Sequence, residues 1–161
     1  MRRALYPGTF DPITLGHLDI IERSLRIFDE VVVSVADTRP GVVFPVEDRV
    51  RLVEAATKHL DRVRVVSFRA LLVHHWESLG KPTVVRGLRA VQDFEAEFAM
   101  ALGNRRLADD FEIIFLMPRN DFVFLSASIV REVARWGGDV SSMVSPPVAE
   151  YLATRYGPPA K

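Results

Sequence analysis

Residues 6–17 read YPGTFDPITLGH, and they join a short apolar segment to the first amphipathic segment of the chain. Two prolines restrict the backbone of this turn, while Gly8 and Gly16 carry no Cβ that would hold a ligand away from the backbone. His17 lies where the amphipathic segment begins, at the predicted start of a helix. Because the first N–H groups of a helix are unpaired and its N-terminus is electropositive, we predict that this turn binds a phosphate group.

Apolar and β-branched runs alternate with segments of helical periodicity along the rest of the chain. The predicted strands cover residues 3–6, 30–36, 63–68, 83–85 and 112–117. The predicted helical segments cover about 16–28, 46–60, 70–79 and 91–107, then a helix capped by Ser126 and closed by Gly137 and Gly138, and a last helix that starts at 145–146 and frays at 157–159. Because strands and helices alternate, we predict one α/β domain over residues 1–161. It should be Rossmann-like: a doubly wound parallel five-stranded sheet with helices on both faces and a C-terminal helix.

Helical spacing also assigns side chains to faces of two helices. In 16–28 the predicted apolar face holds Leu18, Ile21, Leu25 and Phe28, and the predicted polar face holds Asp19, Glu22, Arg23 and Arg26. In 91–107 one apolar stripe holds Val91, Phe94, Phe98 and Leu102.

Composition limits the class of protein. The chain has 161 residues, 21 basic and 21 acidic residues and no cysteine. Its length suits one domain, and the balanced charge argues against binding to nucleic acid. Without cysteine there are no disulfides or thiolate-bound metals, which fits a reducing compartment. No apolar run approaches the length of a signal peptide or a membrane span. We therefore expect a cytoplasmic protein without nucleic-acid or membrane partners.

The segments rich in glycine, proline, arginine and serine follow the predicted strands. Residues 7–17, 37–41, 86–89 and 118–128 each come after a different strand. Because the carboxyl ends of parallel strands meet at one edge of a sheet, we predict the functional site at that edge. The sequence contains neither GxGxxG nor GxxxxGK, which argues against a dinucleotide-dependent dehydrogenase and a P-loop NTPase.

Three ordered motifs carry a family resemblance: GTFDP at 8–12 with TLGH at 14–17, RGLRA at 86–90, and LSAS at 125–128. Their order and spacing resemble those of the (T/H)xGH nucleotidylyltransferases and, within them, the bacterial phosphopantetheine adenylyltransferases. The resemblance implies transfer of AMP from ATP to 4′-phosphopantetheine, which gives dephospho-coenzyme A and pyrophosphate. It also implies Mg²⁺ carried by the ATP phosphates and assembly into a homohexamer.

The same resemblance implies roles for individual residues. His17 would stabilise the transition state, with Arg89 as the second catalytic residue. The implied ATP-binding residues are Thr9, Phe10, His17, Gly87, Leu88, Arg89, Glu97, Phe122, Val123, Phe124, Leu125, Ser126, Ala127 and Ser128. The implied substrate-binding residues are Thr9, Gly41, Leu72 and Arg86, with Arg39 as a further candidate.

The residues alone leave structural alternatives open. A histidine at a helix start can be bonded to nearby backbone, and a serine there can serve only as the N-cap. Arg86 and Arg89 can be surface arginines paired with Asp93, Glu95 or Glu97. Leu72 can belong to the core, Thr9 can be an ordinary loop residue, and Glu97 can lie on a solvated helix face.

The sequence departs from the family pattern at two positions. Gly41 stands where the family usually has a lysine, and the loop after the second predicted strand has no lysine at all, so Arg39 is the candidate replacement. Ala127 stands where serine is common. His59, His74 and His75 lack metal-ligand spacing, so we expect no metal held by protein side chains.

Two alternative functions remain at this stage. One is another enzyme of the superfamily, acting on nicotinamide mononucleotide or on a cytidylyl acceptor. The other is a nucleotide-binding sensor that lost catalysis, for which the missing loop lysine is the motivation.

Overall fold

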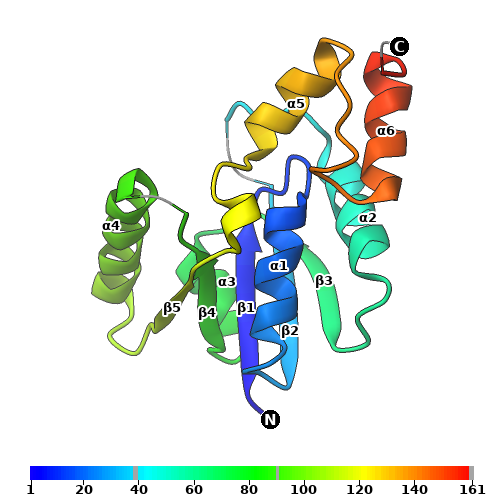
Figure 1. Ribbon diagram of the computed structural model, residues 1–161. Helices are drawn as coiled ribbons and strands as arrows, with labels where there is room; N and C mark the ends of the chain where they lie inside the picture. Colours follow the sequence, from blue (N-terminus) through cyan, green and yellow to red (C-terminus); the bar gives the residue numbers. More distant parts are fainter. Residues whose placement is uncertain (38–39, 90, 160–161) are drawn as a thin grey trace.

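The computed structural model describes residues 1–37, 40–89 and 91–159 (Figure 1). Its centre is a five-stranded sheet with the order β3-β2-β1-β4-β5. The strands are β1 (Arg3–Gly8), β2 (Glu30–Ala36), β3 (Val63–Phe68), β4 (Thr83–Gly87) and β5 (Ile113–Leu116). All four strand pairs are parallel, which confirms the predicted fold class.

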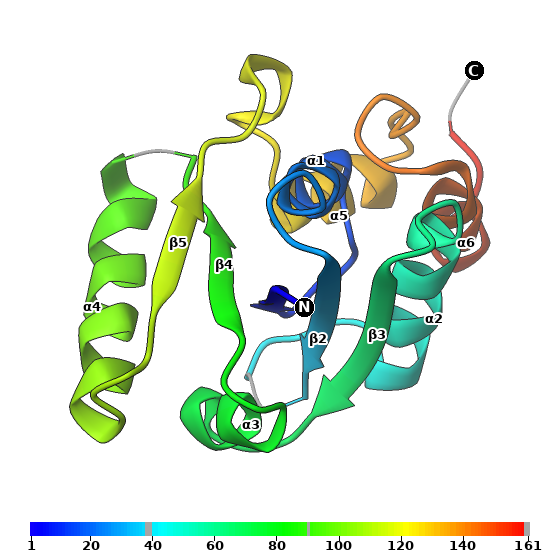
Figure 2. The same cartoon turned by 90° about the horizontal axis from the view of Figure 1, so that it is seen from below.

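Helices cover both faces of the sheet. They are α1 (Leu15–Ser24), α2 (Val46–Thr57), α3 (Leu72–Ser78), α4 (Val91–Leu107), α5 (Ala127–Arg135) and α6 (Pro146–Tyr156), with a short 3-10 helix at Asn120–Phe122. Figure 2 shows α1 and α3 on opposite faces and α4 beside the edge strand β5. The helix at the C-terminus, α6, packs against α2 and α5.

The alternation of side chains along the strands divides the core into two clusters. Val31, Val33 and Val35 of β2 belong to the larger cluster, with residues of α1, α2, α5 and α6. Val32 belongs to the smaller cluster, which surrounds Trp76 of α3. Successive residues of a strand point to opposite faces, so a run of valines can fill both clusters. The run therefore suits a strand covered on both sides.

Several predicted boundaries are shifted. Helix α1 ends at Ser24 rather than near residue 28, because the N–H groups of Arg26 and Ile27 bond three residues back and tighten the turn before β2. Strands β1 and β4 extend to Gly8 and Gly87, two residues beyond the prediction. Gly8 of the GTFDP motif and Gly87 of the RGLRA motif are thus the last residues of their strands, at the carboxyl end of the sheet.

Asp19 is not on the face of α1 that was predicted for it, and the predicted apolar stripe of α4 is exposed. Asp19 was expected on the polar face of α1, but it is 4% exposed. Its carboxylate accepts a hydrogen bond from the Arg119 backbone N–H at 3.0 Å and lies 3.1 Å from Arg119 Nε. In α4 the stripe of Phe94, Phe98 and Leu102 is not covered by the domain, since these residues are 42%, 48% and 52% exposed. Periodicity finds such a stripe but does not say which face of the helix packs on the sheet.

Among the residues that the structure describes, we find no helix whose length and apolar character would let it cross a membrane.

Candidate functional site

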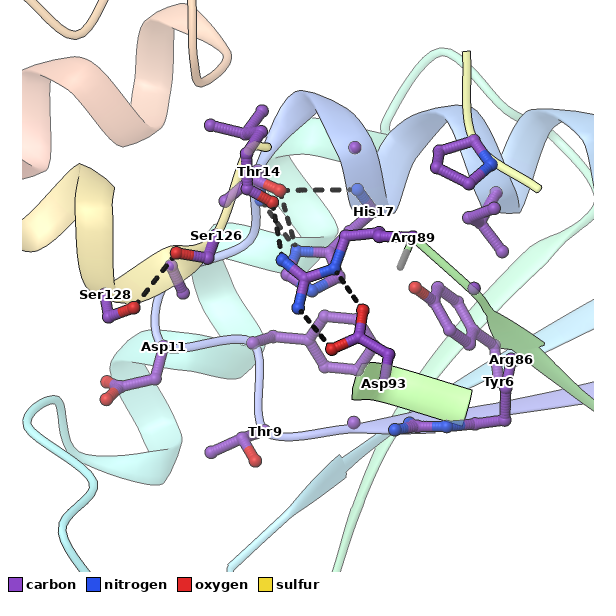
Figure 3. Close-up of a pocket in the computed structure, with 18 of the residues that line it drawn as sticks. Tyr6, Thr9, Asp11, Thr14, His17, Arg86, Arg89, Asp93, Ser126 and Ser128 are labelled. Atoms are coloured by element: carbon purple, nitrogen blue, oxygen red, sulfur yellow. Dashed lines mark hydrogen bonds and ion pairs between the residues drawn. The ribbon is translucent and has the colours of Figure 1, made fainter. Parts of the chain in front are cut away.

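A cavity of about 390 Å³ opens at the carboxyl edge of the sheet, where the sequence predicts a site (Figure 3). Its walls come from the loops after β1, β2, β4 and β5 and from the first turn of α5. The predicted site residues that line it are Thr9, Phe10, His17, Gly41, Arg86, Gly87, Arg89, Glu97, Phe122, Leu125, Ser126, Ala127 and Ser128. Segments from four parts of the chain therefore meet in one cavity.

Other predicted site residues are not among the residues that line the cavity. Leu72 packs against the smaller core cluster, as its structural alternative predicts. The Leu88 backbone N–H donates to the Leu116 carbonyl at 2.9 Å. Val123 and Phe124 do not line the cavity either, and Phe124 is 87% exposed. Arg39 lies outside the described residues.

Gly8 has a structural role that was not predicted. A Cβ at this position would lie 2.8 Å from Cζ of Phe10, so the glycine makes room for this side chain, and it also lines the cavity. Phe10 has a positive φ of 49°, and its ring packs edge-on against Tyr6 and His17, with centroid distances of 5.4 and 5.1 Å. The turn is thus shaped by three packed aromatic side chains that line the cavity.

His17 is held at the third position of α1 by the N-cap residue Thr14. The Thr14 backbone N–H donates to His17 Nδ1 at 3.0 Å, and the His17 backbone N–H donates to Thr14 Oγ1 at 3.4 Å. Because a backbone N–H can only donate, Nδ1 carries no proton, and the neutral ring must carry its proton on Nε2. His17 is therefore bonded to nearby backbone, as the structural alternative expects, and its Nε2–H has no hydrogen-bond partner among the described residues.

The electrostatic surroundings keep this ring neutral. Burial lowers the pKa of His17 to about 3, and the positive charges of Arg89 and Arg86 act in the same direction. At neutral pH the site therefore offers an uncharged N–H donor beside two guanidinium groups. Such a donor can bond to an oxygen that gains negative charge, without itself releasing a proton.

The two arginines do not share one anion. Arg86 donates from Nε to Glu97 Oε2 at 2.8 Å, from Nη2 to Glu97 Oε1 and from Nη1 to the Pro7 carbonyl. Arg89 donates to Asp93 Oδ2 at 3.0 Å and to the Leu125 carbonyl at 2.7 Å. These are the pairings with α4 carboxylates that the sequence left open, and Glu97 is largely buried rather than on a solvated face.

The N-terminus of α5 brings two hydroxyl groups to the cavity. The Ser126 hydroxyl caps the helix by accepting from the Ile129 backbone N–H at 3.3 Å, and it lies 2.9 Å from the Ser128 hydroxyl. The helix has nine residues, and its first turn lines the cavity. Unpaired N–H groups and hydroxyls at this position can bind phosphate oxygens.

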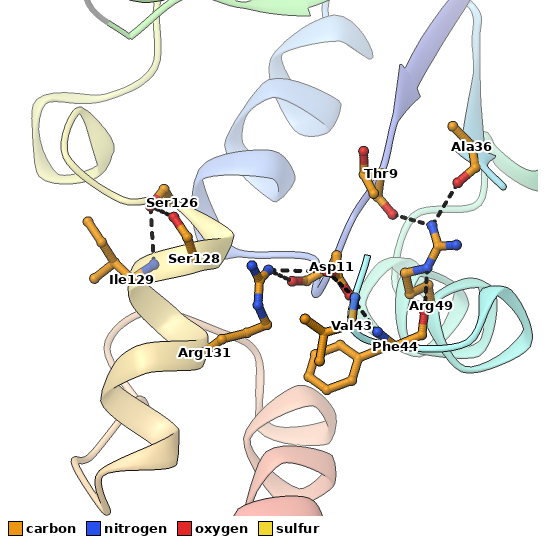
Figure 4. Close-up of polar contacts among 10 residues, drawn as sticks. All are labelled: Thr9, Asp11, Ala36, Val43, Phe44, Arg49, Ser126, Ser128, Ile129 and Arg131. Atoms are coloured by element: carbon orange, nitrogen blue, oxygen red, sulfur yellow. Dashed lines mark hydrogen bonds and ion pairs between the residues drawn. The ribbon is translucent and has the colours of Figure 1, made fainter. Parts of the chain in front are cut away.

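Asp11 and Arg131 are site residues that the sequence reasoning missed (Figure 4). The buried Asp11 carboxylate accepts hydrogen bonds from the backbone N–H groups of Val43 and Phe44, both at 2.9 Å, and lies 3.2 Å from Arg131 Nη1. It therefore ties the loop after β1 to the loop after β2 and to α5. Arg131 lies three residues after Ser128, about one helical turn further on, and both line the cavity. This spacing is the signal in the sequence from which its position could have been predicted.

The side chain of Arg49 in α2 also bonds to the loops after β1 and β2. Its guanidinium donates to the carbonyl oxygens of Thr9 at 2.7 Å, Ala36 at 2.8 Å and Phe44 at 2.9 Å. Burial lowers the pKa of Arg49, against the attraction of the Asp11 and Asp37 carboxylates. The Thr9 backbone is thus fixed by a side chain forty residues away, and no local pattern in the sequence signals this contact.

Within residues 1–37, 40–89 and 91–159, no three His, Cys, Asp or Glu side chains lie together so that they could hold a metal ion. His75 instead contacts the Ser34 hydroxyl at 3.0 Å and stacks on Phe68.

Comparisons with known proteins relate the chain to a solved structure and to a protein family. Among solved structures, the chain is similar to a protein from Vibrio parahaemolyticus described as a nicotinate-nucleotide adenylyltransferase. The two share 22% sequence identity over 98% of this chain and 94% of that one, with a TM-score of 0.72, a likeness that shows the fold. The model of the cytidylyltransferase-like family matches residues 5–133, which include all four loops of the cavity. By this match over most of its length, the chain belongs to the cytidylyltransferase-like family.

Proposed function

We propose that this protein transfers AMP from ATP to 4′-phosphopantetheine and so forms dephospho-coenzyme A and pyrophosphate. Family membership supports nucleotidylyl transfer, and the three motifs that resemble phosphopantetheine adenylyltransferases support this acceptor. The observation that carries the proposal is the neutral His17 ring, with its proton on Nε2, in a cavity that also contains Arg89 and the start of α5. We also propose a cytoplasmic location, because the cysteine-free sequence fits a reducing compartment.

In the proposed reaction an oxygen of the acceptor phosphate attacks the α-phosphorus of ATP. The bond from the α-phosphorus to the bridging oxygen breaks, and pyrophosphate leaves with the electron pair. No general base is needed, because a phosphate monoester is already ionised near pH 7. His17 Nε2–H would donate to an α-phosphate oxygen, while the N–H groups of α5 and the Arg89 guanidinium hold the departing phosphates.

Charge in the cavity has two further sources in this proposal. Mg²⁺ would enter on the ATP phosphates and neutralise the charge of the leaving pyrophosphate. Arg131 lines the cavity and is held there by Asp11, so we propose that it provides positive charge near the loop where Gly41 replaces the family lysine. Arg131 is thus an alternative to Arg39 for this role.

Pyrophosphate release tests the reaction. The enzyme is incubated with Mg-ATP and, in separate reactions, 4′-phosphopantetheine, nicotinate mononucleotide, nicotinamide mononucleotide or no acceptor, with CTP replacing ATP in a parallel series. We expect release only with ATP and 4′-phosphopantetheine together. Release with another acceptor, or with CTP in preference to ATP, would assign a different substrate to the same site. ATP binding without release from any acceptor would favour the sensor.

Nicotinate mononucleotide is the second candidate acceptor, because a structurally similar protein carries the name of a nicotinate-nucleotide adenylyltransferase. We place it second because the motif resemblance extends to Arg86, which it implies as a residue that binds 4′-phosphopantetheine.

We propose that the protein self-associates into a homohexamer, as the family resemblance implies. The support is the exposed stripe of Phe94, Phe98 and Leu102 on α4, in which the two phenylalanine rings stack at 5.4 Å. Replacing Phe98 with glutamate should reduce the mass measured by light scattering at micromolar concentration to that of one chain. Replacing the exposed Trp136 with glutamate is the control and should leave the mass unchanged. A wild-type mass of one chain would contradict this proposal.

A further inference from the structure

Tyr6 is a buried aromatic residue near the end of β1 whose hydroxyl faces the cavity. The residue is 4% exposed, and it lines the cavity together with His17 and Arg89. Its ring is fixed from one side by the edge-on contact with Phe10, and the His17 ring lies 6.5 Å away between centroids. In Figure 3 the Tyr6 hydroxyl points toward the part of the cavity that contains Arg89 and Asp93.

The Tyr6 hydroxyl forms no hydrogen bond with the residues that the structure describes. The oxygen is not among the buried side-chain atoms that lack a partner, so it opens to the cavity that Tyr6 lines, and its O–H is available to a ligand there. The charged groups around it are Arg86, Glu97, Arg89 and Asp19. Both arginines are already bonded to α4 carboxylates and to backbone carbonyls, so neither needs the phenol oxygen as an acceptor.

The surroundings of Tyr6 also determine the protonation state of its hydroxyl group. Burial raises the pKa of Tyr6 to about 12, so the hydroxyl keeps its proton at neutral pH and can donate it in a hydrogen bond. A phenylalanine would make the same ring contacts with Phe10, so packing does not require the oxygen. The groups that face this part of the cavity with donors, namely His17, Arg89 and the first turn of α5, all suit phosphate oxygens.

We propose that the Tyr6 hydroxyl binds the nucleotide by donating a hydrogen bond to one of its phosphate oxygens. The inference rests on the proposed function only in that the cavity takes ATP. Tyr6 would complement His17 as a second uncharged donor, and it would reach the phosphates without displacing an arginine from its carboxylate. The ligand group is a phosphate rather than the adenine ring, because Tyr6 lies among anion-binding groups.

The test compares Tyr6→Phe with wild type by isothermal titration calorimetry, using Mg-ATP and adenosine as separate ligands. We expect Tyr6→Phe to weaken Mg-ATP binding about 10- to 100-fold, the usual effect of losing a hydrogen bond to a charged group. Adenosine binding should be unchanged, because adenosine has no phosphate. Tyr156→Phe is the matched control: its hydroxyl forms no hydrogen bond with the described residues either, but it is buried and the residue does not line the cavity. It should bind both ligands like wild type.

Two results would overturn the inference: unchanged Mg-ATP affinity in Tyr6→Phe, or equal weakening of Mg-ATP and adenosine, which would indicate a displaced ring. Thermal melting of each variant checks that the fold is kept. None of these measurements uses an acceptor. A wild-type protein that binds Mg-ATP but transfers no AMP would therefore contradict the proposed function while leaving the assignment of Tyr6 open to the same titrations.

Discussion

Replacement of His17 by alanine is expected to lower kcat by about 100- to 1,000-fold, with little change in the affinity for Mg-ATP. The reason is that its Nε2–H would bond most strongly to the α-phosphate oxygens when they gain charge during the displacement. Pyrophosphate release measures kcat, and titration calorimetry measures the affinity. Equal losses in rate and in affinity would show that His17 binds the ground state and has no special role in the transition state.

A glutamine at position 17 keeps an N–H donor and should recover part of the activity that the alanine variant loses.

The pH dependence of the rate gives a second check on the role of His17. Because the pKa of His17 is lowered to about 3, the neutral ring persists throughout the neutral range, and falling pH protonates it only far below that range. The ratio of the wild-type rate to the His17→Gln rate should therefore be constant between about pH 6 and pH 8, although an unperturbed histidine titrates near 6.5. A ratio that falls as the pH drops through 6.5 would contradict the neutral-donor role.

Replacement of Arg49 by leucine is expected to lower the free energy of unfolding by about 3–5 kcal/mol, the range for removing one partner from a buried charged network. Arg49 is 2% exposed, and its loss leaves the carbonyl oxygens of Thr9, Ala36 and Phe44 without this donor. Urea denaturation followed by circular dichroism measures the change.

Arg51→Leu is the matched control for this prediction. Arg51 is on the same helix, its side chain is 67% exposed, and it pairs with Asp48 at 2.7 Å. An exposed pair of this kind contributes about 0–1 kcal/mol. If the two variants lose the same stability, the buried contacts of Arg49 are not what holds the loops together.

Local signals in the sequence were sufficient for the fold. The valine run of β2 and the segment of β3 have the predicted bounds, as does α4. Ser126 caps α5 as predicted, since its hydroxyl accepts from the backbone N–H three residues on. These features depend on a few neighbouring residues and on the rule that strands alternating with helices form a parallel sheet. That rule also located the cavity, because it brings the motifs to one edge.

Features that depend on distant partners could not be predicted. Asp19 looks like a surface residue until Arg119, one hundred positions later, is placed against it. Arg49 has the spacing of an ordinary helix residue, and its role depends on carbonyls in the loop after β1, at the end of β2 and in the loop after β2. Leu72, which the resemblance implies in substrate binding, packs against the smaller core cluster, so its role in binding stays a prediction. The identity of the acceptor stays a prediction, because motifs for binding ATP do not define what receives the AMP.

The pairing of Arg86 and Arg89 with the carboxylates of α4 affects which solutes can compete for the cavity. A small monovalent anion such as chloride would have to replace a carboxylate that already satisfies the guanidinium, so it would gain little. A polyphosphate carries several negative charges and can bond to His17, α5 and Arg89 at once. We therefore expect the site to discriminate by the number of charges on a ligand, and to keep working in the mixture of simple salts that surrounds a protein in a cell.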